Sequence, residues 1–456
     1  MDLYAPLVRN WVAPLWAWKD NSQHLRYLRE FEITQYWKPQ KLQTLQWTLL
    51  KKMIAHACQN TIFYKERFEK LGLRPENMKS FEDFRKLPLL TKKEIQERLP
   101  ELVAQNIPKE KLIWNSTGGS TGSPLVFYLD RERLDSRLGS TLRHNRWAGW
   151  QIGDKVGVLW GARQDFTPLQ GLKAKLRNLL LDRQLLLNTF SLTEENLRQF
   201  ARALIKFKPK IILAYANSIY LFAKFVQAEK IAGIRPRAII TSSEVLSLEQ
   251  RQKIESVFEC KIYNRYGCRE TSVIASECER HSGLHLNAEA LYVEIVREGR
   301  PALPGEEGKV VITDLLNYGM PFLRYSIEDT ARPVAQLCPC GRGLPLIEEV
   351  TGRVTDFIVT PEGRLVSGVA LVTYLITNIP GLAQVQLVQD NKESLLVKMV
   401  KNQSYDEKSQ IVLEQRIDEF LGRGVRVEYQ IVDHIPKEPS GKYRFSVSKA
   451  AEAYLR

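Results

Sequence analysis

Residues 115–127 read NSTGGSTGSPLVF and combine a hydroxyl-rich, glycine-rich loop with an apolar run. The seven residues 116–122 are all Ser, Thr or Gly, and Pro124 separates them from the strand-like LVFYL at residues 125–129. Glycine permits backbone conformations closed to other residues, so consecutive amides can point at one anion, and the hydroxyls add donors. The stretch predicts a loop that holds the phosphates of a nucleotide triphosphate; a flexible hairpin is the alternative.

This loop differs from two common phosphate-binding loops. A Walker A loop places a lysine directly after its last glycine, whereas Ser123 follows Gly122 here. The glycine spacing also differs from that of a Rossmann dinucleotide fingerprint. The motifs elsewhere in the chain must therefore decide which nucleotide-binding fold contains the loop.

Length and composition indicate a globular protein of two or three domains. The chain has 456 residues, too many for one ordinary core, of which 44% are hydrophobic and 26% are charged. It contains no run of 18 or more apolar residues, which a membrane-spanning helix would need. The first twenty residues lack the basic start, apolar centre and cleavage site of a secretory signal, so we expect a cytoplasmic protein.

The formal net charge of +14 suits a partner that carries phosphates, such as a nucleotide, a nucleic acid or an anionic lipid. The basic residues are dispersed among acidic ones, and no helix-turn-helix, RNA-binding or zinc-finger signature occurs. We therefore expect no nucleic acid partner.

Tryptophan is concentrated near the N-terminus. Five of the nine tryptophans lie in the first fifty residues: Trp11, Trp16, Trp18, Trp37 and Trp47. They fit either a helical layer packed on the main body or a peripheral membrane contact, because Trp beside Lys and Arg suits a bilayer surface. Pro14 argues against one continuous amphipathic helix in this segment.

Between residues 150 and 260, short apolar runs alternate with helical stretches. The strand-like runs are residues 155–160 (KVGVLW), 210–215 (KIILAY) and 237–244 (RAIITSSE). The helical stretches, residues 192–207 and 247–258, start with Ser or Thr caps followed by acidic residues. This alternation predicts a parallel α/β sheet whose strand ends carry ligand-binding loops.

The pattern of apolar runs and turn residues changes twice along the chain. Beyond Tyr263, apolar runs separated by turn sequences predict an antiparallel β region, and a last segment has the order of a small α+β domain. We therefore expect an α/β protein with a large multi-subdomain N-terminal domain, built from parallel α/β sheets plus a β region. Its parts would be a helical layer (1–105), a core (106–352) and a small C-terminal α+β domain (353–456).

Charged residues follow several of the strand-like runs. Glu270 lies in YGCRET, and a carboxylate held near phosphates suits Mg²⁺, which prefers a few oxygens shared with substrate phosphates. Asp329 in RYSIEDTA follows an apolar strand, where it could accept both hydroxyls of a ribose. Arg353 and Asp356 lie in TGRVTDF, and Lys442 lies in PSGKYR. Taken singly, Glu270 can also be explained as a solvated charge in a turn, and Lys442 as a surface lysine.

Together these motifs resemble the adenylate-forming enzyme superfamily. STGGSTGSP, YGCRE, RYSIEDT, GRVTD and PSGKYR occur in its order over roughly residues 45–445. Within the superfamily the chain is similar to the phenylacetate–CoA ligase branch, and there to the CapK-type proteins associated with capsular polysaccharide. Five motifs in register are far more specific than any one of them.

The resemblance implies that most of these residues bind ATP. The loop that would hold its phosphates consists of Ser116, Thr117, Gly118, Gly119, Ser120 and Thr121. The residues near the adenine would be Ser243, Glu244 and Tyr266. Asp329 would hold the ribose, and Arg353 would add a contact close to a hinge near Asp356.

The reaction that the resemblance implies joins a carboxylic acid to AMP, releases pyrophosphate and passes the acyl group to CoA or to an amine or hydroxyl acceptor. The carboxylate and the α-phosphate are both anions, so the site must supply cations. Glu270 would hold Mg²⁺, and Lys442 would reach in from the small, mobile domain, which in the family rotates between the two steps. An acceptor on a sugar at the inner membrane face would fit surface polysaccharide biosynthesis.

Two positions depart from the family pattern. Leu125 stands where a lysine usually follows the loop's proline, and Glu328 stands where a glycine commonly precedes the ribose aspartate. Both substitutions leave the expected chemistry in place but allow a differently tuned site. The alternatives to a ligase are an adenylyl transferase that places AMP on a hydroxyl and a non-catalytic nucleotide-binding scaffold.

Cysteines and histidines in two distant segments suit a structural zinc site. CERHSGLH offers Cys278 with His281 or His285, and CPCGR offers Cys338 and Cys340. Disulfides are rare in cytoplasmic proteins, whereas three thiolates and one imidazole make a closed tetrahedral zinc site. In related sequences of this branch the histidine of the Gly-Leu-His segment is the match, which favours His285. Reduced cysteines in tight turns are the alternative.

Overall fold

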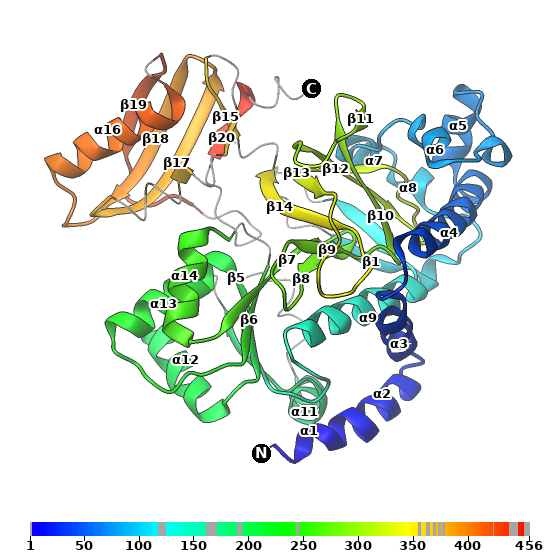
Figure 1. The fold of residues 1–456 in the computed structure, drawn as a ribbon, viewed down its shortest axis with the longest axis horizontal. Coiled ribbons are helices and arrows are strands. Elements are labelled where there is room, and N and C mark those ends of the chain that lie inside the picture. The colour runs from blue at the N-terminus through cyan, green and yellow to red at the C-terminus, as the bar shows by residue number, and fades with distance from the viewer. Residues whose placement is uncertain are drawn as a thin grey trace. The chain divides into compact units, whose positions relative to one another are not determined.

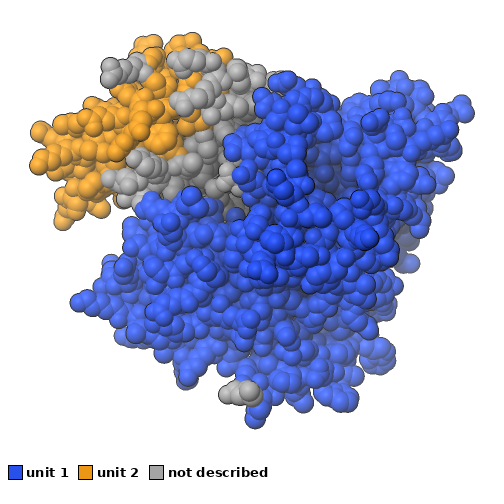
Figure 2. Space-filling view, in the orientation of Figure 1, with its two compact units in different colours: residues 1–327, 332–349 blue, residues 328–331, 350–456 orange. Residues whose placement is uncertain are grey.

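The computed structural model describes the chain in twelve stretches. They are residues 2–116, 125–160, 171–188, 194–242, 246–353, 357–361, 365–367, 371–372, 375, 379–422, 424–436 and 446–450. The chain divides into two compact units (Figure 2). Unit 1 comprises Met1–Ile327 and Arg332–Glu349, and unit 2 comprises Glu328–Ala331 and Val350–Arg456.

Unit 1 begins with a layer of helices, drawn in blue in Figure 1. They are α1 (Tyr4–Leu7), η1 (Val8–Val12), α2 (Ala13–Lys19), α3 (His24–Thr34), α4 (Pro39–Asn60), α5 (Ile62–Lys70), η2 (Pro75–Asn77), α6 (Phe81–Arg85), α7 (Lys92–Glu97), α8 (Leu99–Leu102) and η3 (Lys109–Lys111). Ser80 and Thr91 start α6 and α7 with reciprocal capping boxes. Most of the layer expected to be helical, residues 1–105, is helical in the structure.

The first three helices run on without a break, so the expectation that Pro14 interrupts them is wrong. Val8 and Val12, at the junctions, both keep right-handed helical dihedrals. Pro14 has no N–H to donate, but it lies in the first turn of α2, directly after the wide π-helical turn η1. A π-helical turn lets the backbone groups around the proline find other hydrogen-bond partners, so the helix continues past Pro14.

A 12-stranded sheet forms the body of unit 1, in the order β11-β10-β12-β13-β14-β9-β8-β7-β6-β5-β3-β4. Its strands are β3 (Val156–Trp160), β4 (Gln184–Asn188), β5 (Ile211–Tyr215), β6 (Ala238–Ser242), β7 (Lys261–Cys268), β8 (Ser272–Glu277), β9 (Leu284–Leu286), β10 (Leu291–Arg297), β11 (Arg300–Pro301), β12 (Gly308–Asp314), β13 (Tyr325–Val334) and β14 (Leu346–Arg353). Strands β3 to β7 pair in parallel, which confirms the predicted α/β sheet.

Helices cover both faces of the parallel part of this sheet. The helices of this part of the chain are α9 (Arg131–Trp147), α11 (Leu172–Arg177), η5 (Asn178–Asp182), α12 (Glu194–Phe207), α13 (Ala216–Ala228) and α14 (Leu248–Phe258). Neighbouring strand residues point to opposite faces: Ile212 and Ile239 join a core with α12 to α14, whereas Ile211 and Ile240 pack with residues of the N-terminal helices. A parallel sheet buried on both faces explains why its strands read as continuous apolar runs.

The antiparallel region predicted beyond Tyr263 is not a separate sheet. Strand β7 joins the two parts, because Lys261 to Asn264 pair in parallel with β6 and Arg265 to Cys268 pair antiparallel with β8. The change of partner falls within one strand. The sequence pattern therefore showed only that the arrangement of apolar runs changes near this strand.

Unit 2 is a small α+β structure, as expected. Its elements are β15 (Phe357–Val359), β16 (Leu365–Ser367), β17 (Leu382–Asn391), β18 (Ser394–Lys401), α16 (Glu407–Leu421), β19 (Arg426–Ile431) and β20 (Ser446–Ser448). A four-stranded sheet in the order β19-β18-β17-β20 packs against α16 through Leu413, Ile417 and Leu421. Within the described residues, the structure contains no helix long and apolar enough to cross a membrane.

Candidate functional site

The residues predicted to bind ATP fall into two groups. Those outside the described residues are Thr117, Gly118, Gly119, Ser120, Thr121, Ser243, Glu244 and Lys442, together with the hinge residue Asp356. Those within them are Ser116 at the end of β1, Tyr266 on β7, Glu270 in the β7–β8 turn, Asp329 on β13 and Arg353 at the end of β14.

The two ends of chain that flank residues 117–124 lie side by side. Strands β1 (Ile113–Ser116) and β2 (Val126–Leu129) pair antiparallel, with Ser116 opposite Val126. Leu125, which departs from the family's lysine, is fully buried. An apolar side chain at that position therefore packs into the core, where a lysine would lose its hydration.

Glu270 lies at the tip of a tight hairpin between β7 and β8. Cys268 pairs with Ser272, so the turn is only residues 269–271, and a bulge shifts the register between Tyr266 and Gly267. A Cβ on Gly267 would lie 2.4 Å from the Ser272 carbonyl oxygen, so only glycine fits there. The hairpin thus presents Glu270, which is half-buried, at a defined point.

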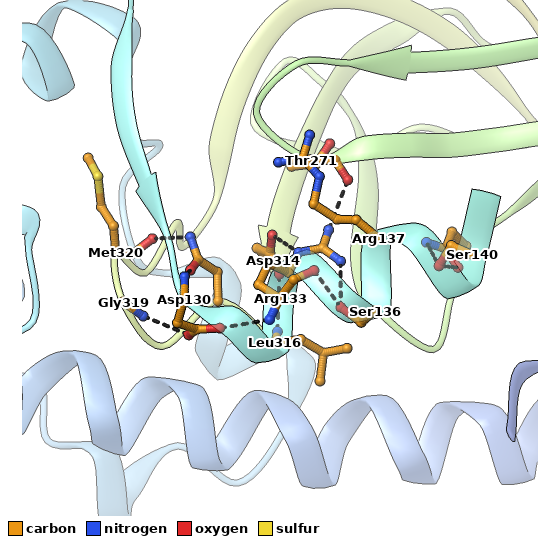
Figure 3. Close-up of polar contacts among 12 residues, drawn as sticks. Asp130, Arg133, Ser136, Arg137, Ser140, Thr271, Asp314, Leu316, Gly319 and Met320 are labelled. Carbon is orange, nitrogen blue, oxygen red and sulfur yellow. Dashed lines mark hydrogen bonds and ion pairs between the residues drawn. The ribbon is translucent and has the colours of Figure 1, made fainter. Parts of the chain in front are cut away.

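Helix α9 holds this turn through two arginines, and Figure 3 shows the contact of Arg133 with Thr271. The Arg137 guanidinium donates to the carbonyl oxygen of Arg269 at 2.7 Å, and Arg133 donates to that of Thr271 at 2.9 Å. The two carbonyls flank Glu270, so both backbone groups beside the carboxylate are fixed by guanidinium groups, of which that of Arg133 is fully buried. Burial and the neighbouring Arg133 lower the pKa of Arg137 to about 10, and its guanidinium still carries charge at neutral pH.

The charge of Arg133 is balanced inside the protein. Its Nε lies 2.6 Å from Oδ2 of Asp314, the last residue of β12, and the two side chains are 0% and 1% exposed. The main chain around Asp314 is tied to the same helix, because Asp130, the N-cap of α9, accepts from the N–H groups of Tyr318 and Gly319 at 2.7 and 2.9 Å. Burial raises the pKa of Asp130 despite these donors.

Two further contacts surround Glu270. The Tyr325 hydroxyl, at the start of β13, donates to Oε1 of Glu270 at 3.0 Å. Next to it, Nε of Arg269 donates to Oδ1 of Asn115 at 3.3 Å, and Asn115 directly precedes Ser116. The structure therefore brings the Glu270 turn to the end of β1, from which the predicted phosphate loop departs.

Asp130, Arg133, Arg137 and Asp314 were not identified from the sequence. Arg133 and Arg137 stand four residues apart and thus on one helix face, but such a pair is usually a solvated surface feature. Trp147, at the end of the same helix, lies in the core, where it packs with Cys278 and Cys338.

The structure also brings the four predicted zinc ligands together. The ligand atoms of Cys278, His285, Cys338 and Cys340 all lie within 4.8 Å of one another. The Cys278 and Cys338 sulfurs are 3.7 Å apart, and Cys340 Sγ is 3.4 Å from His285 Nε2. A tetrahedral zinc ion with Zn–S distances of about 2.3 Å separates its thiolates by about 3.8 Å, so the donor set fits.

The surroundings of this cluster suit a metal with three thiolates. The backbone N–H groups of Arg280 and Arg342 each donate to a cysteine sulfur at 3.4 Å. Burial lowers the pKa of His285 to about 4, which keeps the imidazole neutral, as metal ligation requires. The alternative ligand His281 lies outside the cluster, with its Nδ1 3.2 Å from Oε2 of Glu277.

Comparisons with known proteins were consistent with this fold. Residues 358–449 match the CapK C-terminal domain family. The chain is 25% identical to protein CapK of Staphylococcus aureus over 393 residues, which are 86% of this chain and 85% of that protein. It is 26% identical to the phenylacetate-coenzyme A ligase of Escherichia coli (strain K12) over 331 residues, 70% of this chain and 72% of that enzyme.

A solved structure has the same fold. It is 2-hydroxyisobutyryl-CoA ligase in the postadenylation state in complex with 2-HIB-AMP, with a TM-score of 0.72, 19% identity and coverage of 91% of this chain and 90% of that chain. The resemblance to the adenylate-forming superfamily, its phenylacetate–CoA ligase branch and the CapK-type proteins is therefore confirmed.

The buried pair of Arg133 and Asp314 generates a stability prediction. Arg133→Met should lower the free energy of unfolding by about 3–5 kcal/mol, because it leaves Asp314 charged and unpaired in the core. Adding Asp314→Leu should restore much of the loss. The control is Lys93→Met on α7, whose pair with Glu97 has side chains that are 81% and 59% exposed and should contribute only about 0–1 kcal/mol. Equal thermal unfolding midpoints for the two single variants would contradict the buried-charge account.

The Cys/His cluster generates a second prediction. The purified chain should contain about one zinc ion per molecule by plasma mass spectrometry, and Cys338→Ser should remove it. His281→Ala is the matched control and should keep the metal, because His281 lies outside the cluster. Loss of zinc in the His281 variant but not in His285→Ala would reassign the ligand.

Proposed function

We propose that the chain is an AMP-forming ligase. It would activate a carboxylic acid with ATP to an acyl-adenylate and transfer the acyl group to CoA or another acceptor. The observation that carries this proposal is the Glu270 turn, fixed by Arg133 and Arg137 beside the end of β1. A carboxylate at that point can meet the phosphates that the Ser/Thr/Gly loop is proposed to hold.

The charges of the site support this chemistry. Mg²⁺, when bound, supplies positive charge to the phosphates of ATP. Glu270 is the residue proposed to hold it, and the hydrogen bond from Tyr325 orients one carboxylate oxygen, leaving the other for a cation. Lys442 is proposed to stabilise the negative charge that builds up as the substrate carboxylate attacks the α-phosphate.

The remaining nucleotide contacts are proposed from the superfamily pattern. Tyr266, buried on β7, would stand beside the adenine, and Asp329, half-buried on β13, would accept the ribose hydroxyls. Arg353 would contact the nucleotide close to the boundary near Asp356. Zinc at the Cys/His cluster would be structural, since all four of its ligand positions come from protein.

The similarity to CapK suggests the setting of the reaction. We propose that the acyl group passes to CoA, or to an amine or hydroxyl of a sugar during surface polysaccharide biosynthesis at the inner membrane face. An adenylyl transferase would share the nucleotide site but release no pyrophosphate in response to a carboxylate. Dependence of pyrophosphate exchange on a carboxylate therefore distinguishes a ligase from an adenylyl transferase.

The test is ATP–pyrophosphate exchange across aryl, fatty, amino and uronic acids with Mg²⁺. We expect exchange that depends on one class of acid, and a loss of about 10²-fold or more in Lys442→Ala, because an electrostatic stabiliser of the transition state is removed. Lys437→Ala, in the same segment, controls for charge and should keep full exchange.

A second arm separates the two half-reactions. The Lys442→Ala variant is supplied with the synthetic acyl-adenylate of the acid that the panel identifies. It should still transfer the acyl group to CoA, because Lys442 is proposed to act only in the adenylation step. Exchange that needs no carboxylate, or a Lys442 variant with normal exchange, would contradict the proposed ligase.

A further inference from the structure

We propose that unit 1 binds the surface of a bilayer that contains anionic lipids, through one apolar face made by two segments far apart in sequence. We call it the Trp–Leu face. It consists of Leu3, Leu7, Trp11, Leu15 and Trp18 on the N-terminal helix and Leu172, Leu176 and Leu179 on α11 and η5. This inference stands independently of the reaction catalysed.

The N-terminal helix has two apolar faces, of which only one is used in folding. Ala5, Val8, Ala13 and Ala17 are buried against the body of unit 1. The five residues of the Trp–Leu face on this helix are 48% to 82% exposed, with Trp18 the most exposed. These large apolar side chains therefore contribute little buried surface to the folding of unit 1.

The π-helical turn keeps these side chains in line. They follow one another mostly in steps of four residues, and in a regular α-helix of 3.6 residues per turn each such step rotates a little further around the axis. The wide turn η1 (Val8–Val12) takes up more residues per turn and cancels part of that drift. Leu3, Leu7 and Trp11 can therefore share one outward face with Leu15 and Trp18.

The helix is fixed on the body of unit 1, so the orientation of this face is defined. A Cβ on Gly153 would lie 2.4 Å from the Ala5 carbonyl oxygen, which shows how closely the helix backbone approaches this glycine. The Arg9 guanidinium donates to the Ile152 carbonyl oxygen at 3.2 Å. Because the helix is already fixed on unit 1, it loses little conformational entropy when it binds a surface.

The second segment lies directly beside the first (Figure 1, α1 and α11). The Tyr4 hydroxyl donates to the Leu180 carbonyl oxygen at 3.1 Å, and the Arg177 guanidinium lies 5.8 Å from the centre of the Trp16 ring. Here Leu172, Leu176 and Leu179 are 51% to 85% exposed. Two segments about 160 residues apart in the printed sequence thus extend one apolar surface.

The charges around the face are complementary to an anionic surface. Residues 2–20 and 171–183 together contain six basic and three acidic residues, a net charge of +3. Two of the acidic residues are already paired, Asp2 with Arg183 at 2.8 Å and Asp182 with Arg177 at 3.1 Å. Lys173 and Lys175 are exposed between the leucines of α11. This combination of Trp, Leu and Lys matches the surface of an anionic bilayer. The indoles and leucines would enter the interface, and the ammonium groups would contact the lipid phosphates.

The experiment is co-sedimentation of the full chain with vesicles of phosphatidylcholine alone and with 30% phosphatidylglycerol. We expect binding at least tenfold tighter to the anionic vesicles and weaker binding at high salt. Trp11→Ser/Leu15→Ser/Trp18→Ser should lose at least tenfold in affinity. The control is Leu303→Ser/Ile431→Ser, which removes exposed apolar residues elsewhere and should bind like the wild type.

A second variant keeps the test decisive if the triple variant misfolds. Lys173→Gln/Lys175→Gln changes only exposed charges and should weaken binding to anionic vesicles by roughly tenfold or more, with an unchanged melting temperature. Absence of vesicle binding by the wild type, or equal binding by wild type and both variants, would overturn the proposal. So would a wild-type dimer that the triple variant converts to monomer in sedimentation velocity without any vesicle binding, since a second copy would then cover the face.

Discussion

The buried charge of Arg133 is the constraint on which the site depends. A guanidinium that has lost its water must be matched by partners of fixed geometry. Arg133 obtains them from three places: the carboxylate of Asp314 at the end of β12, the Thr271 carbonyl in the β7–β8 turn and the Ser136 hydroxyl on its own helix. Helix α9, strand β12 and the Glu270 turn therefore cannot shift independently of one another.

The same helix reaches the Cys/His cluster at its other end. Trp147, the last residue of α9, packs edge-on against His285 with ring centres 5.5 Å apart and carries the Arg342 guanidinium 4.6 Å from its own ring centre. Three thiolates around a zinc ion would leave one net negative charge, and the buried Arg342 stands next to Cys340 to balance it. One helix of 17 residues thus links the proposed catalytic carboxylate to the proposed structural metal.

Much of the fold, and part of the candidate site, could be predicted from the sequence. Apolar runs, caps and turn residues predicted the parallel sheet and the small α+β unit, and Cys spacing with the family match predicted a four-residue cluster that the structure brings together. The π-helical turn before Pro14, the change of partner within β7 and the buried arginines of α9 could not be predicted. The last two depend on contacts with distant segments, such as Asp314 for Arg133, which no short stretch of sequence shows.

The most direct test of the central claim asks whether Arg137 acts on metal binding through Glu270. Electron paramagnetic resonance of Mn²⁺ can measure metal affinity in the presence of ATP for Arg137→Met, Glu270→Gln and the double variant. Positioning of Glu270 by Arg137 predicts weaker Mn²⁺ binding in each single variant, and no further loss when Arg137→Met is added to Glu270→Gln. An equal loss from Arg137→Met in both backgrounds would contradict the account, because the arginine would then act independently of the carboxylate.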